Sequence, residues 1–372
     1  MGAGRTIVRM QARRRWGMVL TAVVLLCSVP IVINKWPARA TDIGTGALRE
    51  RIAASARQPY QGYAQSIGLL PLPPLPNLEQ VTALVSARTE MRTWYAARDR
   101  WRVDVIDGGS ERDLYQTPDA QYVWDYGANQ LSQIVGDQPI RLPRAADLTP
   151  PDLVRRLLDV ATGDRFVALP GKRVAGLAAA GLRIVPATAD TTVSHIDIWA
   201  DPGTGLPLQA EVTAKGGVRP VFVTRFLEVH MSVPAAEVLT PPTPRPDMGF
   251  TVTAAPDILS ALNRWRPAVL PDRLAGSPRR DTVAGQAVAG VYGTGLAQFV
   301  AIALPGRFGS QAYHKVATFG QEVKVPAGNA ALISTGLLSV LVVRAQRTYL
   351  VAGLVQPAVL RHVAADLSGA AA

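Results

Sequence analysis

The sequence predicts a mainly β protein of the α+β class: a strongly curled antiparallel half-barrel with a helical lid, followed by a smaller C-terminal α+β domain. The chain has 372 residues, of which 48% are hydrophobic and 18% charged, so it is long enough for two globular domains. Short segments that alternate between apolar and polar residues follow one another between turn sequences, as antiparallel strands do. About ten such strands with few helices are too many for a small flat sheet, so we expect the sheet to curl around one or two helices.

Residues 1–40 have the order of parts of an export signal. A basic segment precedes an apolar run from Gly17 to Ile33, and Ala38-Arg39-Ala40 is a small-x-small site typical of signal peptidase cleavage. The apolar run is longer than that of an ordinary cleaved signal and approaches the ~18 residues of a membrane span. A cleaved signal and an uncleaved anchor both remain open, and we favour the anchor. We expect the rest of the chain at the outer face of the cytoplasmic membrane, or in the periplasm or cell envelope if the signal is cleaved.

The charge of the chain does not indicate a nucleic-acid-binding protein. The formal net charge is +11, but without the basic residues of segment 1–40 the balance falls to 32 basic against 28 acidic residues, or +4. Cys27 is the only cysteine and lies in the apolar run, so the exported part has neither a disulfide nor a thiolate metal site. Leu26 precedes it where a lipoprotein signal needs a small residue, so we expect an apolar filler rather than a lipidated cysteine.

The elements of the first domain, residues 41–238, follow in order. Residues 42–58 can form a short helix, "YQGYAQS" a strand, and the proline-rich Leu69–Asn77 an extended loop. Residues 85–135 predict a meander with turns at "AARD", "DGGSE", "TPDA" and "GAN". A helix is predicted in "LTPPDLVRRLLDVATG", with Thr149 as N-cap and Gly163 after its end. Strands then resume from residue 166 to 229, with turns at "DPGTG" and "KGG".

Residues 239–250 form a proline-rich segment that we expect to be a stiff linker between domains. Residues 251–372 predict a compact α+β domain. Its expected elements are a helix near 255–265, strands near 288–292 and 296–304, a helix near 309–319, strands from 331 to 355, and a final helix "PAVLRHVAADL".

Catalytic and cofactor-binding patterns were not found, so we expect a protein that is not an enzyme and binds no cofactor or metal. The four histidines have no partner at a metal-ligand spacing. Neither "GTGAL" nor "YGTGLA" has the full pattern of a phosphate-binding loop, and there is no GxSxG motif. The aspartates and glutamates are spread over turns and strand faces, with no pair that the sequence places together.

Three segments resemble the LolA/RseB superfamily, whose members share an unclosed lipoprotein-carrier-like β-barrel. They are "MRTWYAARDRWRVDVI", "DAQYVWDYGANQ" and "IWADPGTGLPLQAEV". "YGTGLAQFVAIAL" and the segment from residue 341 to 367 are similar to the C-terminal domain of the sigma-E factor regulatory protein RseB, which LolA carriers lack. The resemblance is therefore closest to RseB.

The resemblance implies an apolar groove on the concave face of the half-barrel, which accepts a lipid, an acylated protein or an exposed polypeptide segment. The candidate groove residues are Trp94, Trp101, Val103, Tyr122, Trp124 and Tyr126. Packing of these rings beneath the helices is the alternative. Arg98, Arg100 and Arg102 form a basic edge that could hold an acidic partner, although a solvated strand face is the simpler interpretation.

Two functions remain open. The resemblance implies a membrane-anchored sensor that binds an apolar ligand and modulates an anti-sigma factor through its extracytoplasmic region. The alternative is a lipid or lipoprotein carrier of the cell envelope. The C-terminal domain and the expected anchor favour the sensor.

Overall fold

The computed structural model describes residue 16 and residues 43–71, 79–107, 109–136, 141–255, 270–280 and 289–369. Among these residues no helix is both long enough and apolar enough to cross a membrane. The predicted signal or anchor, most of the proline-rich loop and the helix expected near 255–265 lie outside the described residues.

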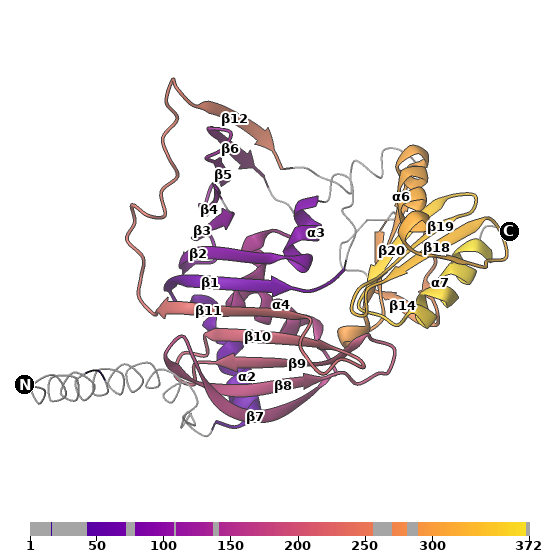
Figure 1. Ribbon diagram of the computed structural model, residues 1–372, viewed down its shortest axis with the longest axis horizontal. Coiled ribbons are helices and arrows are strands. Elements are labelled where there is room, and N and C mark those ends of the chain that lie inside the picture. The colour runs from indigo at the N-terminus through magenta and orange to yellow at the C-terminus, as the bar shows by residue number, and fades with distance from the viewer. Residues whose placement is uncertain are drawn as a thin grey trace, which may run out of the picture.

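The first domain is built on one sheet of twelve strands. Their order in the sheet is β12-β6-β5-β4-β3-β2-β1-β11-β10-β9-β8-β7. The bounds are β1 Tyr60–Gly68, β2 Arg88–Ala97, β3 Arg100–Asp107, β4 Ser110–Gln116, β5 Gln121–Asp125, β6 Gln130–Val135, β7 Arg165–Val174, β8 Leu177–Val185, β9 Val193–Ala200, β10 Pro207–Ala214, β11 Phe222–His230 and β12 Gly249–Ala254. The two edge strands, β7 and β12, do not pair, so the sheet stays open, and it bends sharply between β2 and β6 (Figure 1). The predicted half-barrel fold is confirmed.

Helices cover one face of this sheet, which we call the inner face. They are α2 (Thr45–Ala54), η1 (Ser55–Arg57), α3 (Glu79–Ser86), η2 (Ala145–Leu148) and α4 (Pro150–Val160). Leu48 and Ile52 of α2 and Val154 of α4 pack with fully buried strand residues such as Ile198 and Phe226. This cluster is the main core, and it lies mostly over the β7–β11 half of the sheet.

The local sequence explains α4. Thr149 occupies the N-cap position and Pro150 the first helical position, where a missing N–H costs nothing. The Thr149 hydroxyl donates to the Asp152 carboxylate at 3.0 Å and does not accept from a backbone N–H, so its side chain makes no capping hydrogen bond. Gly163 follows with a φ of +90°, a conformation that glycine adopts without strain.

The second domain has an eight-stranded sheet in the order β13-β14-β15-β16-β20-β19-β18-β17. Its elements are β13 Arg273–Leu274, β14 Ser277–Arg280, β15 Ala289–Tyr292, η3 Gly295–Ala297, β16 Phe299–Leu304, α6 Gly306–Phe319, β17 Gln321–Val323, β18 Asn329–Ser334, β19 Ser339–Arg344, β20 Thr348–Gly353 and α7 Pro357–Gly369. Helix α7 packs on one face through Leu360 and Val363, and α6 packs on the other through Tyr313 and Val316. The predicted α+β architecture is thereby confirmed.

The proline-rich segment is not a free linker, which corrects the predicted boundary. Gly249–Ala254 forms β12 and pairs in parallel with β6, so the first sheet extends to residue 254. Residues 231–248, which we call the strap, run beside the sheet from the end of β11 to this edge (Figure 1). Leu239 and Met248 of the strap are buried. The strap is therefore part of the fold of the first domain.

Candidate functional site

The six predicted groove residues do not lie on one surface. Register pairs Thr93 with Val103 and Tyr95 with Trp101, which places Trp101 and Val103 on the inner face beneath the helices. Val103 is 3% exposed and belongs to the main core. These two residues pack, and in the described structure they do not line a groove.

Trp94, Tyr122 and Trp124 lie on the opposite, outer face, and Tyr126 follows in the turn after β5. Trp124 is 6% exposed and packs with Tyr115, Leu131 and Met248, while Tyr122 contacts the same cluster. The ring of Tyr126 meets the Trp124 ring edge to face at 5.4 Å and is mostly exposed. Tyr122 and Trp124 therefore belong to a small second core with Met248 of the strap, on the face opposite the helices. The expected packing beneath the helices applies only to Trp101 and Val103.

The three arginines of the predicted basic edge do not share one environment. Arg98 and Arg100 are exposed at the β2–β3 turn, whereas Arg102 is drawn into the outer face. Its guanidinium lies between the rings of Trp94 and Tyr115, at 5.0 and 4.9 Å from their centroids. It donates to Asp104 at 2.5 Å and to Asp113 at 2.9 Å, and reaches the Val238 carbonyl of the strap at 3.4 Å. Arg102 is thus already satisfied within the protein and does not form an open acidic-partner site.

The inner face of β4 to β6 is largely polar. Arg112 of β4 pairs with Asp125 of β5, and Gln121 donates to Gln116 at 2.8 Å. Between β6 and β12, the Gln130 side chain donates to the Thr251 hydroxyl at 3.3 Å. Apolar residues are mixed with these polar pairs, but the described part of this face does not form a continuous apolar hollow for an acyl chain.

A tightly bonded joint connects the two domains. Leu296 and Leu337, from two loops of the second domain, are buried in the main core of the first. Thr191 donates to the Leu296 carbonyl at 2.9 Å and to the Leu354 carbonyl at 2.6 Å, and Thr192 donates to the Leu337 carbonyl. These buried contacts fix the domains relative to each other more firmly than a surface contact would.

The Asp164 carboxylate, in the turn between α4 and β7, completes the joint. It accepts from the backbone N–H of Leu296 at 3.0 Å and from that of Ala187 at 2.9 Å. Gly295 has a φ of +55°, and a Cβ there would lie 2.8 Å from both Asp164 oxygens. Gly295, the second glycine of "YGTGLA", is therefore explained by the close approach of Asp164 and not by phosphate binding.

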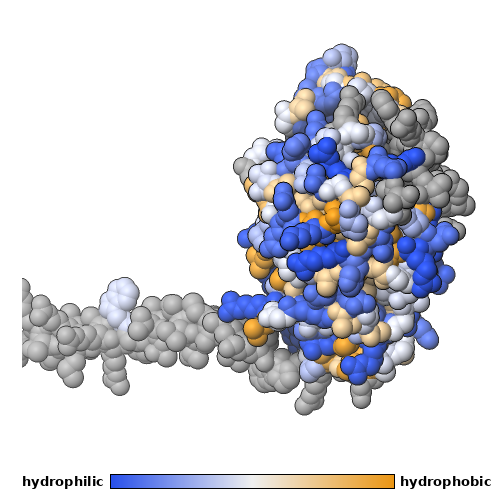
Figure 2. All heavy atoms as spheres, turned by 90° about the vertical axis from the view of Figure 1, so that its right-hand side faces the viewer, coloured by the Kyte–Doolittle hydropathy of each residue, from blue (hydrophilic) through white to orange (hydrophobic). Residues whose placement is uncertain are grey.

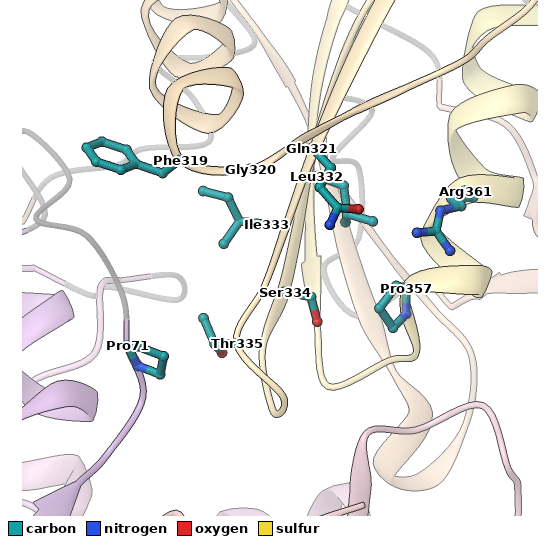
Figure 3. Close-up of a pocket in the computed structure, with 10 residues that line it drawn as sticks. All are labelled: Pro71, Phe319, Gly320, Gln321, Leu332, Ile333, Ser334, Thr335, Pro357 and Arg361. Atoms are coloured by element: carbon teal, nitrogen blue, oxygen red, sulfur yellow. The ribbon is translucent and has the colours of Figure 1, made fainter.

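Beside this joint lies a cleft of about 820 Å³, within the roughly 300–1,000 Å³ of ordinary ligand sites. Pro71, just after β1, forms its wall on the first domain, and the second domain supplies the rest (Figure 3). The lining residues are Pro71, Phe319, Gly320, Gln321, Leu332, Ile333, Ser334, Thr335, Pro357 and Arg361. Pro357 follows Gln356, whose backbone N–H donates to the Asp190 carbonyl at 2.6 Å, so the cleft wall continues directly into the joint.

The cleft surrounds the uncovered end of strand β18. β17 pairs with Ala330, Ala331 and Leu332, and no other described strand pairs with this edge of β18 from Ile333 onward. The Thr335 N–H bonds to Leu338 within the β18–β19 hairpin, and backbone direction alternates along a strand, so Ser334 presents its N–H and C=O to the open edge.

Side chains of different character flank this open edge. On the α6 side lie Ile333, which packs with α6, and Phe319, which is 54% exposed. On the α7 side lie Ser334 and Arg361, with Arg361 directed toward the cleft (Figure 3). On the face of the molecule shown in Figure 2, hydrophobic residues occur in small groups among hydrophilic ones. The cleft therefore combines an apolar wall, a cationic side chain and a free strand edge.

The sequence did not predict this cleft, because its residues come from separate elements and carry no motif. The same holds for Asp104 and Asp113, which the sequence appeared to scatter. They lie directly opposite each other in the β3–β4 hairpin, and both are 1% exposed. The turn predicted at "DGGSE" was the available signal, since a turn sets the register of its hairpin.

Comparisons with known proteins concern the fold alone. No family model and no curated protein matches the sequence. Solved structures that are similar include the complex of Pseudomonas aeruginosa MucA/MucB, with 18% identity, 86% of this chain and 97% of that chain covered, and a TM-score of 0.48. MucB in complex with MucA(peri) has 17% identity, coverage of 87% and 97%, and a TM-score of 0.48. The LolA superfamily protein NE2245 from Nitrosomonas europaea has 10% identity, coverage of 54% and 99%, and a TM-score of 0.25. With TM-scores below 0.5, no function is transferred from these structures.

Proposed function

We propose that this protein is an extracytoplasmic regulator that binds an extended polypeptide segment in the cleft between its two domains. The partner is the extracytoplasmic region of a membrane anti-sigma factor, the partner class that the sequence resemblance implies. The single observation that carries the proposal is the open edge of β18 inside a cleft with an apolar wall, next to the domain joint.

The geometry favours a polypeptide over an acyl chain. A segment that adds to a strand edge obtains its affinity from main-chain hydrogen bonds and its specificity from side chains that point alternately to the two faces. At Ser334 such a segment would meet the N–H and C=O that point to the strand edge, with Ile333 and Phe319 on one face and Arg361 on the other. A suitable segment therefore has apolar residues on one face and an acidic residue on the other.

The position of the cleft explains how binding could be sensed. Pro357 lines the cleft, and the adjacent Gln356 bonds to Asp190 and, through its side chain at 3.1 Å, to the Thr191 carbonyl. A bound segment that shifts the start of α7 acts directly on these joint contacts. Such a connection between two sites is what a regulator needs in order to couple them.

The experiment is a pull-down of detergent-solubilised membranes with the full chain, followed by mass spectrometry and lipid extraction. Ser334→Trp fills the cleft at an exposed position, and Val218→Trp is the matched control at a residue that is 99% exposed on the first domain. We expect the anti-sigma factor with the wild type and the control, and at least a tenfold loss with Ser334→Trp. Lipid recovered without an anti-sigma factor would instead identify a carrier and contradict the proposal.

A further inference from the structure

Three carboxylates meet on the outer face of the β3–β4 hairpin, away from the cleft. Asp104 is opposite Asp113, and Glu111 lies two residues before Asp113 on the same face of β4. One oxygen from each of the three lies within 4.8 Å of the others. The two aspartates are 1% exposed, and the partly exposed Glu111 forms the rim toward solvent.

The positive charge that bonds to this cluster does not balance it. Among the described residues, Arg102 forms ion pairs with Asp104 and Asp113, and it bonds to one oxygen of each. Arg92 lies beside Asp104 in register on β2, but its side chain is exposed. With all three carboxylates ionised, Arg102 leaves two negative charges unbalanced in a largely buried place, which is unfavourable.

A buried oxygen of the cluster also has no donor. Asp113 Oδ2 accepts from Arg102 at 2.9 Å and from the Tyr115 hydroxyl at 3.3 Å, whereas Asp113 Oδ1 is buried and has no hydrogen-bond partner among the described residues. A buried carboxylate oxygen without a partner is rare, because it loses its hydration and gains nothing in return. Asp113 Oδ1 is therefore a buried oxygen of the cluster that can coordinate a cation.

We propose that Asp104, Glu111 and Asp113 bind a divalent cation of the Ca²⁺ type. The donors are all carboxylate oxygens, which hard cations prefer, and a charge of +2 balances the two unbalanced negative charges. Ca²⁺ binds oxygens at about 2.3–2.6 Å, so two of its ligands can be nearly 5 Å apart, and oxygens that lie within 4.8 Å of one another meet this requirement. The coordination of Ca²⁺ is also more flexible than the octahedron that Mg²⁺ requires.

Terbium luminescence tests the proposal on the full chain, because Tb³⁺ occupies Ca²⁺ sites and is excited by a nearby indole. Trp124 is the cross-strand neighbour of Asp113, which places a sensitiser beside the site. We expect sensitised Tb³⁺ emission that Ca²⁺ displaces, and Ca²⁺ should raise the melting temperature by several degrees.

Glu111→Gln should reduce the Tb³⁺ affinity at least tenfold, and because Glu111 is partly exposed this variant should fold. Asp119→Asn removes one exposed carboxylate at the β4–β5 turn and should leave the affinity unchanged. Sensitised Tb³⁺ emission that is absent in the wild type, or equal in the wild type and Glu111→Gln, would overturn the proposal.

Discussion

The carboxylate of Asp164 accepts a hydrogen bond from the backbone N–H of Leu296 across the domain boundary, at 3.0 Å. Asp164 belongs to the first domain and Leu296 to η3 of the second, and Leu296 is 2% exposed within the core of the first. One buried carboxylate thus anchors the loop that inserts into the neighbouring core. The joint built on this contact connects the second domain, which supplies most of the cleft lining, to the first.

Asp164→Ala should loosen the joint. The substitution leaves the backbone N–H groups of Leu296 and Ala187 without their acceptor, and each unsatisfied buried group costs about 1–3 kcal/mol. We expect a loss of about 2–4 kcal/mol in the free energy of unfolding and two separate calorimetric transitions instead of one. Hydrogen exchange should also speed up at Leu296 before it does in β9 and β10.

The control for this variant is Asp159→Ala, an exposed aspartate near the end of α4. It should change the free energy of unfolding by less than about 0.5 kcal/mol. If Asp164→Ala behaved like this control, the carboxylate would have no part in joining the domains.

Trp124→Ala should destabilise the first domain instead of emptying a ligand groove. The ring is 6% exposed among Tyr115, Leu131 and Met248, and removing a buried tryptophan costs about 3–5 kcal/mol. Chemical denaturation monitored by circular dichroism measures the loss. Tyr126→Ala, at the exposed neighbouring ring, should cost less than about 1 kcal/mol, and equal costs for both variants would contradict a second core under the strap.

Stability should fall as the pH rises from about 4 to about 7 when a chelator keeps divalent ions away. The pKa of Asp104 is raised from 3.8 to about 7, chiefly by burial, so in this window the folded state holds a proton that the unfolded state has lost. Unfolding then releases a proton, and the free energy of unfolding decreases with pH. Below this window the Asp104 carboxyl is protonated in both the folded and the unfolded state, and above it the carboxyl is ionised in both.

The same titration with Asp104→Asn isolates the effect, because other carboxylates have shifts of the opposite sign. Hydrogen bonding to Arg141 helps to hold the pKa of Asp147 below its usual value, against the opposing effect of burial, so Asp147 contributes a stability that is lost as the pH falls. The free energy of unfolding of the wild type, minus that of Asp104→Asn, should therefore decrease between about pH 4 and about pH 7. A difference that is flat with pH would show that Asp104 titrates normally.

Much of the fold could be predicted because period-two alternation and turn residues are local signals. The meander from β2 to β6, the helix α4 and the β9–β11 hairpins all follow from them. β12 could not be predicted in this way, since its parallel partner β6 is more than a hundred residues away and the prolines before it resemble a linker. The strap is stabilised by the burial of Leu239 and Met248, a tertiary effect without a local pattern.

The site was less predictable than the fold. Alternation showed correctly that Trp101 and Val103 share an apolar face, but it could not show that helices cover that face or that Trp124 lies on the other one. Arg102 appeared solvated because the strap that covers it comes from residues far along the chain. The cleft depends on where β17 ends relative to β18, which only the pairing of the strands reveals.

A photo-crosslinking amino acid in place of Phe319, in cells that produce the full chain, tests whether the cleft binds an anti-sigma factor. Phe319 is 54% exposed in the cleft wall, so the replacement should not disturb the fold. We expect a crosslink to the extracytoplasmic region of a membrane anti-sigma factor, lost when Ser334→Trp fills the cleft and absent when the crosslinker replaces Val218. A crosslink only to lipid, or one that Ser334→Trp leaves unchanged, would show that the cleft is not the binding site.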